Sequence, residues 1–499
     1  MTASIFAGPV RGGVPWTEAL AEGEVMSQTR RGFLGAGMVG IVAVACGGNE
    51  APASAPSTVA TKAPAAAAPT AAPAVQPTVA PTVAPIKAST AGPIWILDHP
   101  LQLPVRKALE GRVSEFEKAF PGAKVEYEGV VEPNDNQEKF AILLAAGTMP
   151  DAAVTHTGFM QQWPHFSDLK PYLAKDTKIK ADDFFPTIFK AFDVQVGTGT
   201  RQIGIPREVH ATVLYYAKNA VSAAGLKEPG KDWTHTEFVD WAVKLSEWKD
   251  NPQEAKWAAH NVTALSGASM GLPIFWEFGA EFFSPDGKSC IIDQQPARDA
   301  FQFLVDLVSK HRITPSPAEL AASGLTGSQQ GMFGTGRFRA YASNQNTAPV
   351  GTNAVQFDWD LQLLPQVPGK KRATRMAGNA YGVITAGKNK NPDLAWELVK
   401  YFVGDDGSTA QMQAGNFMAN KKATEKWPET RAPAKNGKVV FEAMDGYARL
   451  EHRPKGWDKA MVVINREWTK VLNGQQSIGG MISVAKPEAD GILKQEQGS

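Results

Sequence analysis

The chain has 499 residues, with 51 Lys and Arg against 50 Asp and Glu, and 43% of its residues are hydrophobic. This length exceeds what one compact core usually holds, which predicts two or more lobes. The balanced charge argues against a nucleic-acid-binding protein, and the composition is that of an ordinary globular protein.

A predicted export signal occupies residues 1–45. Arg30-Arg31 precedes an uncharged apolar stretch, Gly35–Ala45, and the pair resembles a twin-arginine signal. That stretch is too short for a membrane span of about 20 residues but suits a signal peptide. The small residues before Cys46 resemble a lipobox, so Cys46 is expected to be lipidated and to become the mature N-terminus. Met26 is an alternative translation start.

Residues 46–92 form the expected anchor and linker. Repeated Pro, Ala, Thr and Val cannot bury a core or propagate a helix, which predicts a semi-extended spacer. At about 3 Å per residue it could hold a domain on the order of 100 Å from the bilayer. The protein is therefore expected outside the cytoplasm, anchored to the cell membrane by its lipid. Lipidation of Cys46 would leave Cys290 without a disulfide partner.

The globular part opens with alternating strands and helices. The apolar spacing predicts strands at 94–97, 123–127 and 151–154, with helices at 105–120 and 137–146 between them. This β-α-β-α-β order predicts a parallel sheet covered by helices. Further helices are predicted at 238–248, 296–311, 393–403 and from 467 onwards, and further strands at 204–206, 212–216, 339–343, 359–364 and 381–384.

Several segments, in a fixed order, carry a resemblance to a known family. The sequence resembles the bacterial extracellular solute-binding proteins of the sugar-binding, maltose-binding-like type over nearly all of residues 93–480. The segments that carry the resemblance include Phe116–Gly122, Leu144–Asp151, Ile203–Pro206, Leu214–Lys218, Gly331–Phe333, Gly378–Val383 and Asn391–Trp396. Ala217 departs from the family pattern, where Asn is usual before Lys.

The resemblance implies an α/β, two-lobed periplasmic-binding-protein fold with hinge crossovers and a ligand cleft between the lobes. By analogy, the N-terminal lobe comprises 93–212 and 380–435, and the C-terminal lobe comprises 213–379 and 436–499. The crossings are expected near Val209–Val213, Gly378–Val383 and Asn436–Phe441. The resemblance also implies a partner, an ABC permease in the membrane, that receives the captured solute.

Candidate ligand contacts follow from strand ends and hinges, because sugar sites need aromatic faces and planar polar groups. At each position the alternative is a purely structural side chain, and His210 stands where the maltose-binding pattern has an acidic residue. Trp163 and Trp457 are secondary candidates. The main candidates are His99, His156, Thr157, His210, Trp276, Asn344, Asn346, Asn379 and Tyr381.

The sequence contains no recognisable catalytic or metal-binding pattern. It lacks a Gly-rich phosphate loop, an HExxH motif and a Gly-x-Ser-x-Gly elbow, so neither a cofactor nor a metal is expected. The leading hypothesis is a carbohydrate-binding lipoprotein of an ABC importer. The alternatives are the same fold binding another solute (polyol, glycerol phosphate, polyamine or peptide), a secreted polysaccharide-active enzyme, or a sensor. An anionic ligand is a further alternative, because Arg207, Arg337 and Arg375 lie near hinge-like segments.

Overall fold

The computed structural model describes residues 92–99, 102–130, 133–350, 354–385, 387–388 and 391–498. The expected signal region, Cys46 and nearly all of the linker lie outside these residues. None of the helices in the described ranges is long and apolar enough to cross a membrane.

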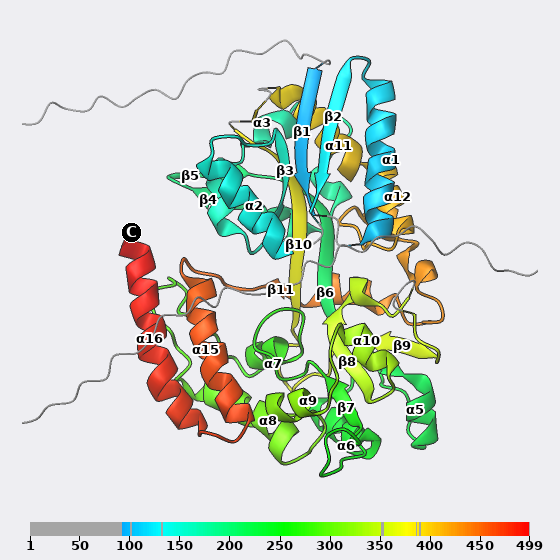
Figure 1. The fold of residues 1–499 in the computed structure, drawn as a ribbon, viewed down its shortest axis with the longest axis vertical. Helices are drawn as coiled ribbons and strands as arrows, with labels where there is room; N and C mark the ends of the chain where they lie inside the picture. Colours follow the sequence, from blue (N-terminus) through cyan, green and yellow to red (C-terminus); the bar gives the residue numbers. More distant parts are fainter. Residues whose placement is uncertain are drawn as a thin grey trace, which may run out of the picture. The chain divides into compact units, whose positions relative to one another are not determined.

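The predicted β-α-β-α-β opening is confirmed (Figure 1). Its elements are β1 (Gly92–Asp98), α1 (Leu103–Ala119), β2 (Ala123–Gly129), α2 (Pro133–Ala145) and β3 (Ala152–His156). β1 pairs in parallel with both β2 and β3. β1 forms an interior strand of the sheet because of its apolar residues: Ile94, Ile96 and Leu97 are fully buried.

Two long strands run through the middle of the main sheet. In the described chain its order is β2-β1-β3-β10-β6-β8-β7, with β9 also on β6 and β11 on β10. The strands not yet bounded are β4 (Asp193–Val196), β5 (Gly199–Gln202), β6 (Ile205–Ala217), β7 (Trp257–His260), β8 (Phe338–Asn344), β9 (Trp359–Gln362), β10 (Thr374–Val383) and β11 (Ala448–Leu450). β4 and β5 form a separate hairpin.

β6 and β10 connect the two parts of the sheet. β10 is antiparallel to β3 on one edge and to the first half of β6 on the other. The second half of β6 pairs with β8 and β9. Every residue of both strands is buried. The segments expected to cross near Val209–Val213 and Gly378–Val383 lie within these strands.

The third crossing differs from the expectation near Asn436–Phe441. Helix α14 (Val439–Gly446) occupies that segment, because its apolar residues Val439, Val440, Ala443 and Met444 recur at helical spacing and are buried. The strand that reaches the hinge is β11, which pairs in parallel with the start of β10. The chain enters α15 at Trp457 soon afterwards.

The remaining helices surround this sheet. They are α3 (Lys170–Leu173), α4 (Pro186–Ala191), α5 (Lys218–Ala223), α6 (His235–Leu245), α7 (Gly271–Glu277), α8 (Gln295–Ser309), α9 (Pro317–Ala322), α10 (Gln329–Gly334), α11 (Pro392–Val403), α12 (Asp405–Gln413), α13 (Lys421–Thr424), α15 (Trp457–Leu472) and α16 (Ile478–Gly498). The predictions of α6, α8 and α11 are confirmed. The last helical region begins at Trp457 and not at 467, since Ala460, Met461 and Ile464 already form a buried face.

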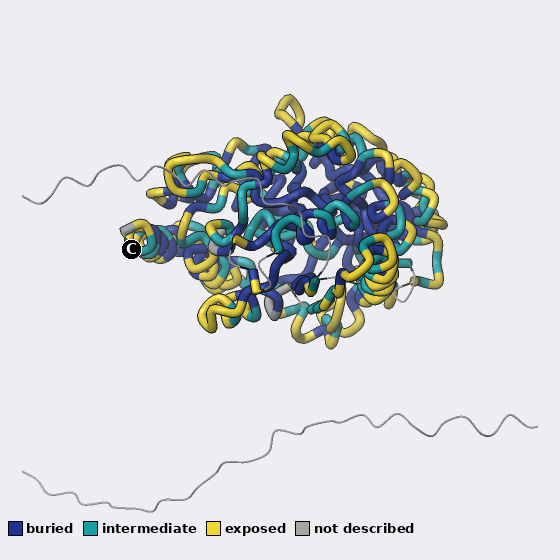
Figure 2. The backbone as a smooth tube through the Cα atoms, turned by 90° about the horizontal axis from the view of Figure 1, so that it is seen from above, coloured by how far each residue is buried: buried dark blue, intermediate teal, exposed yellow. Residues whose placement is uncertain are grey.

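Two large apolar clusters form the core of the described chain. The first joins β1, β3 and α11 and extends along β6 to Ala217. The second joins α6, α8, α15 and α16. Figure 2 shows the buried backbone in the interior and the exposed turns around it. Two clusters linked by continuous strands are what two lobes and a hinge require, and the residue boundaries of the lobes stay a prediction.

Candidate functional site

A group of polar side chains lies where β1 and β3 end beside β6 and β10. We call it the hinge cluster. It comprises Asp98, His99, His156, Arg207, Glu208, His210, Asn379 and Tyr381. The strand register brings it together, since Asn379 of β10 faces His156 of β3 on one side and Glu208 of β6 on the other. Carboxyl ends of parallel strands are a common place for ligand sites in α/β sheets.

Arg207 is the centre of the hinge cluster. Its guanidinium donates to Asp98 Oδ1 at 2.9 Å, to Glu208 Oε1 at 2.5 Å and to the Tyr381 hydroxyl at 3.0 Å. Arg207, Asp98 and Glu208 all have 0% exposed area. A buried charge is costly unless it is paired and hydrogen-bonded, and this network supplies both.

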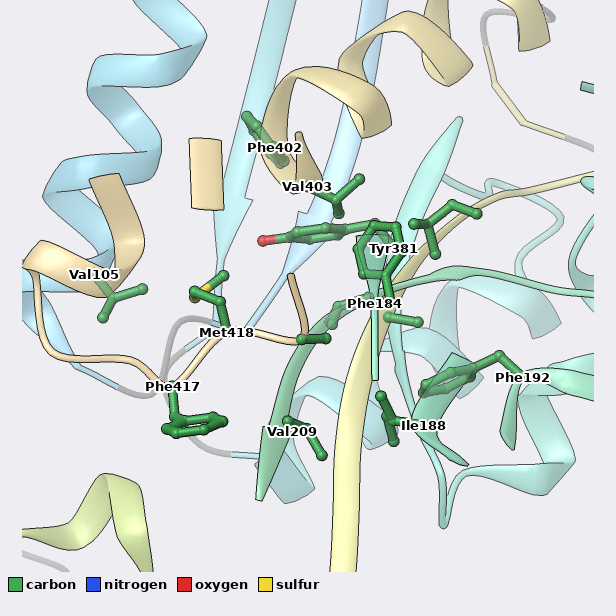
Figure 3. Packing of buried hydrophobic residues seen from close by; sticks show 14 of the residues in the cluster. Val105, Phe184, Ile188, Phe192, Val209, Tyr381, Phe402, Val403, Phe417 and Met418 are labelled. Carbon is green, nitrogen blue, oxygen red and sulfur yellow. The ribbon is translucent and has the colours of Figure 1, made fainter. Parts of the chain in front are cut away.

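Tyr381 joins the hinge cluster to the core. Its hydroxyl donates to Asp98 Oδ2 at 3.0 Å, and Tyr127 donates to the same oxygen at 2.7 Å. The ring packs 5.3 Å from that of Phe402, with Val403 nearby (Figure 3). Tyr381 is fully buried, so these contacts position the hinge strand.

Glu208 connects Arg207 to two predicted ligand contacts. Asn379 Nδ2 donates to Glu208 Oε1 at 2.5 Å, and His210 Nε2 lies 3.6 Å from Glu208 Oε2. Burial by itself would raise the pKa of Glu208, but Arg207, His210 and Asn379 outweigh it and hold that pKa well below its usual range. The carboxylate therefore stays charged.

Two histidines of the cluster, His99 and His156, favour the neutral form. Burial, with a further contribution from Arg207, lowers the pKa of His99 to about 4. Neither ring nitrogen of His99 has a hydrogen-bond partner among the described residues. Burial lowers the pKa of His156 well below the usual value, and Arg375 and Arg453 lower it further. Its Nδ1 accepts a hydrogen bond from the Gly158 amide at 2.9 Å.

A small cavity of about 100 Å³ adjoins the hinge cluster. It lies where β3 and β11 end against the same edge of β10. Thr157, predicted from the sequence, is in its wall, and the Thr157 hydroxyl also accepts from the Gly378 amide at 3.4 Å. The lining residues are Thr157, Trp163, Ala191, Arg375, Met376, Leu450, Glu451 and Arg453.

A larger and more open cavity of about 850 Å³ lies beside α5. It is lined by Lys218, Asn219, Ser222, Glu228, 355–358 and Pro433, and contains none of the predicted ligand contacts. Its Lys218 and Glu228 pair with each other at 2.7 Å. We favour the hinge cavity, because buried polar groups from several strands converge there.

Asn344 and Asn346 lie on the opposite edge of β6 from β10. Asn344 pairs with Thr212 across β6 and β8, and its Oδ1 accepts from the Asn346 amide. Asn346 Oδ1 accepts from the Phe417 amide at 2.9 Å, while its Nδ2 has no partner among the described residues. The structure therefore places both near the hinge but outside the lining of the small cavity.

Trp276 lies in α7 and is 6% exposed within the second apolar cluster. The Arg449 guanidinium covers its ring at 4.4 Å from the centroid. The two secondary candidates lie closer to the small cavity: Trp163 lines it, and the Trp457 ring carries the guanidinium of Arg453 at 3.8 Å. Direct ligand contact by each predicted residue stays a prediction.

Charged residues of the site were largely missed in the sequence. Asp98, Glu208, Glu451 and Arg453 belong to no recognisable motif, and only the strand register brings them together. Arg207 and Arg375, two of the three arginines near hinge-like segments, lie at the site, whereas Arg337 bonds to backbone carbonyls, including those of Ala255 and Ser323. The described residues contain no His, Cys, Asp and Glu group suited to a metal ion.

Comparison with known proteins defines the class. The bacterial extracellular solute-binding protein family matches residues 100–409, and the chain belongs to that family. A binding protein of Brucella abortus is 21% identical over 394 residues, which are 76% of this chain and 88% of that protein. An ABC transporter-binding protein of Deinococcus radiodurans is 24% identical over 255 residues, 48% of this chain and 56% of that protein.

Solved structures share the fold. An ABC substrate-binding protein of Listeria monocytogenes in complex with cycloalternan has a TM-score of 0.67 and 22% identity, covering 81% of this chain and 98% of that chain. The sugar-binding protein MalE of Xanthomonas citri has a TM-score of 0.65 and 17% identity, with coverage of 81% and 98%. The protein is thus a bacterial extracellular solute-binding protein, a non-enzymatic class.

Proposed function

We propose that the protein captures a carbohydrate between its two lobes and delivers it to an ABC permease. The observation that carries this proposal is the convergence of hydrogen-bonding side chains and Trp163 at the hinge. Sugars are bound by planar polar groups that meet their hydroxyls and by aromatic faces that meet their C–H surfaces. The Listeria protein of the same fold holds cycloalternan, and a Thermotoga maritima protein holds maltose, which supports the class of ligand.

Lobe closure would act through β6 and β10. Both strands are continuous through the hinge and carry Glu208, His210, Arg375 and Asn379 on their way between the apolar clusters. A ligand that contacts groups from both lobes favours the closed arrangement by its differential affinity. The closed lobes would then present a surface that the permease recognises.

Membrane attachment belongs to the same proposal. Lipidation of Cys46 and the linker over 46–92 would keep the binding domain near its permease. Tethering raises the effective concentration of one partner at the other without any new contact. A twin-arginine signal would carry the chain across the membrane first.

The carbohydrate proposal is tested by thermal shift and calorimetry on the purified full chain with mono- and oligosaccharides, polyols, polyamines and peptides. A bound sugar should raise the melting temperature, because it stabilises only the folded state. Trp163→Ala should weaken the sugar at least about tenfold, which is about 1.4 kcal/mol. Trp248→Ala, at a ring 40% exposed and covered by Arg312, is the matched control. If a polyamine or peptide binds while every sugar fails, the carbohydrate proposal is wrong.

A further inference from the structure

Two cations and one carboxylate line the small hinge cavity. Arg375 Nε lies 3.2 Å from Glu451 Oε2. Arg453 reaches the same oxygen, through Nε at 3.0 Å and Nη2 at 2.5 Å. Both guanidinium groups share one carboxylate. Arg375, Arg453 and Glu451 together therefore carry a net charge of +1.

Hydrogen-bond donors remain at this cavity. Within the described ranges, the Nη groups of Arg375 and Nη1 of Arg453 have no hydrogen-bond acceptor, and Arg375 is only 8% exposed. The indole N–H of Trp163, also in the wall, is buried and has no partner there. Burial lowers the pKa of Arg375, and Arg453 adds to this while Glu451 opposes it. The Nη atoms of Arg375 and Nη1 of Arg453 are not among the buried atoms without a partner in the described chain, so they are open to solvent and can donate to a ligand.

The hinge cluster does not supply that acceptor. Its carboxylates, Asp98 and Glu208, are engaged by Arg207. The nearest ring of the cluster, His156, is held neutral partly by Arg375 and Arg453 themselves. Asp458, at the start of α15, interacts with Arg453 and Glu451 but does not line the cavity, whose lining holds two guanidinium groups and one carboxylate.

The geometry of the cavity suits a small anion. Arg453 is fixed from two sides, by Glu451 and by the Trp457 ring. The cavity, of about 100 Å³, has room for a carboxylate or phosphate group. Guanidinium forks match both anions in planar, charge-assisted hydrogen bonds.

We propose that the ligand is an acidic sugar whose carboxylate or phosphate enters this cavity and accepts hydrogen bonds from Arg375 and Arg453. This rests on the proposed carbohydrate function and specifies it. The sugar ring would extend from the cavity towards the hinge cluster. Trp163 and Thr157 would contact the part next to the anion.

Calorimetry on the purified full chain with matched sugars tests the inference. The panel pairs glucose and galactose, and their oligosaccharides, with the corresponding uronates and phosphates. We expect at least one acidic sugar to bind tenfold or more tightly than its neutral counterpart. The uronate and phosphate arms show which anion is used, and inorganic phosphate and acetate alone should bind at least tenfold more weakly than that sugar.

Arginine variants connect the result to the cavity. Arg375→Gln and Arg453→Gln should each weaken the acidic sugar at least tenfold and weaken its neutral counterpart by a clearly smaller factor. Arg298→Gln, on α8 and outside the cavity, removes the same charge as a control. Arg453→Gln keeps the test valid if the buried Arg375 variant does not fold.

Two different failures can be told apart. A neutral sugar that binds as well as its acidic counterpart, or acidic binding that survives both arginine variants, overturns the acidic-sugar inference and leaves the carbohydrate function standing. Inorganic phosphate that binds as tightly as any sugar phosphate overturns it too. If no sugar binds at all, neutral or acidic, both proposals fail together.

Discussion

Arg207 shows how one residue can hold the strands of the hinge together. It contacts β1 through Asp98, β10 through Tyr381 and its own strand through Glu208. Each of these groups is buried, so water cannot replace a hydrogen-bond partner that is lost. The network therefore fixes the relative positions of three strands at the site.

Replacing Arg207 by Met should destabilise the fold strongly. Asp98 and Glu208 would be left buried without their cation, and breaking a buried pair in this way costs about 3–5 kcal/mol. Urea denaturation measures the loss. Glu110→Gln breaks the exposed Arg106–Glu110 pair, at 2.9 Å, and should cost only about 0.3–0.5 kcal/mol. Similar losses in the two variants would contradict this account of Arg207.

His99 makes stability depend on pH. Its pKa falls to about 4 in the fold, mainly by burial, against about 6.5 in the unfolded chain. Between these values the unfolded chain binds more protons, so the free energy of unfolding should fall as the pH is lowered from about 6.5 to about 4. His260, whose pKa burial also lowers to about 4, adds to the same slope.

Denaturation at a series of pH values tests the His99 prediction. His99→Gln should reduce the slope by about 1.4 kcal/mol per pH unit within that window. His452→Gln, at an exposed histidine, should leave it unchanged. A His99→Gln slope equal to that of the unaltered chain would show that this ring does not titrate as described.

At the scale of elements, the crossing strands depend on close backbone approach. β10 passes between β3 and β6, and a Cβ at Gly378 would lie 2.5 Å from the carbonyl oxygen of Glu208 and 2.7 Å from Ile188 Cδ1. Backbone cannot yield as a flexible side chain can. Gly378 therefore lets β6 and α4 pack against β10, which holds Arg375 and Asn379 in register.

Gly378→Ala should destabilise the protein by about 1–3 kcal/mol, the usual cost of overpacking a core. Gly111→Ala is the matched control, because a Cβ there meets nothing within 4 Å in α1. In that helix the substitution should stabilise by about 0.5–1 kcal/mol. Thermal unfolding of both variants measures the difference. Loss of stability in Gly111→Ala, or none in Gly378→Ala, would contradict the packing argument.

At the scale of the molecule, the folded part contains two apolar clusters and a hinge that would bind the solute. The N-terminal region would attach the protein to the membrane. The clusters keep each part of the chain folded, while β6, β10 and β11 lie at the junction. Cys290 is fully buried in the second cluster, and burial raises the pKa of its thiol to about 11, so it is poorly reactive in the folded chain.

Lipidation at Cys46 is expected to hold the protein at the membrane. Cys46→Ser should abolish incorporation of labelled palmitate in cells and release the chain from the membrane fraction. Cys290→Ser is the matched control and should keep both the label and the membrane location, since that thiol is buried. Label that persists in Cys46→Ser would rule out this anchor.

The order of the elements and the family resemblance can be predicted from the amino-acid sequence alone. Regular apolar spacing predicts β1, α1, α8 and α11 because burial of one face is a local property of the pattern. Strand ends predict His99 and His156, and hinge positions predict His210 and Asn379, as ligand contacts; the strand register brings all four into the hinge cluster. The predicted third crossing lies too early in the chain, because α14 and β11 follow each other closely and only pairing with β10 distinguishes them.

Which charged side chains meet depends on the three-dimensional fold. Asp98 and Arg207 are 109 residues apart, and Arg375 and Glu451 are 76 apart. No local pattern encodes such pairs, because register between distant strands and the route of β11 bring them together. The excess positive charge at the hinge cavity, and with it the proposal of an acidic sugar, therefore follows from the fold.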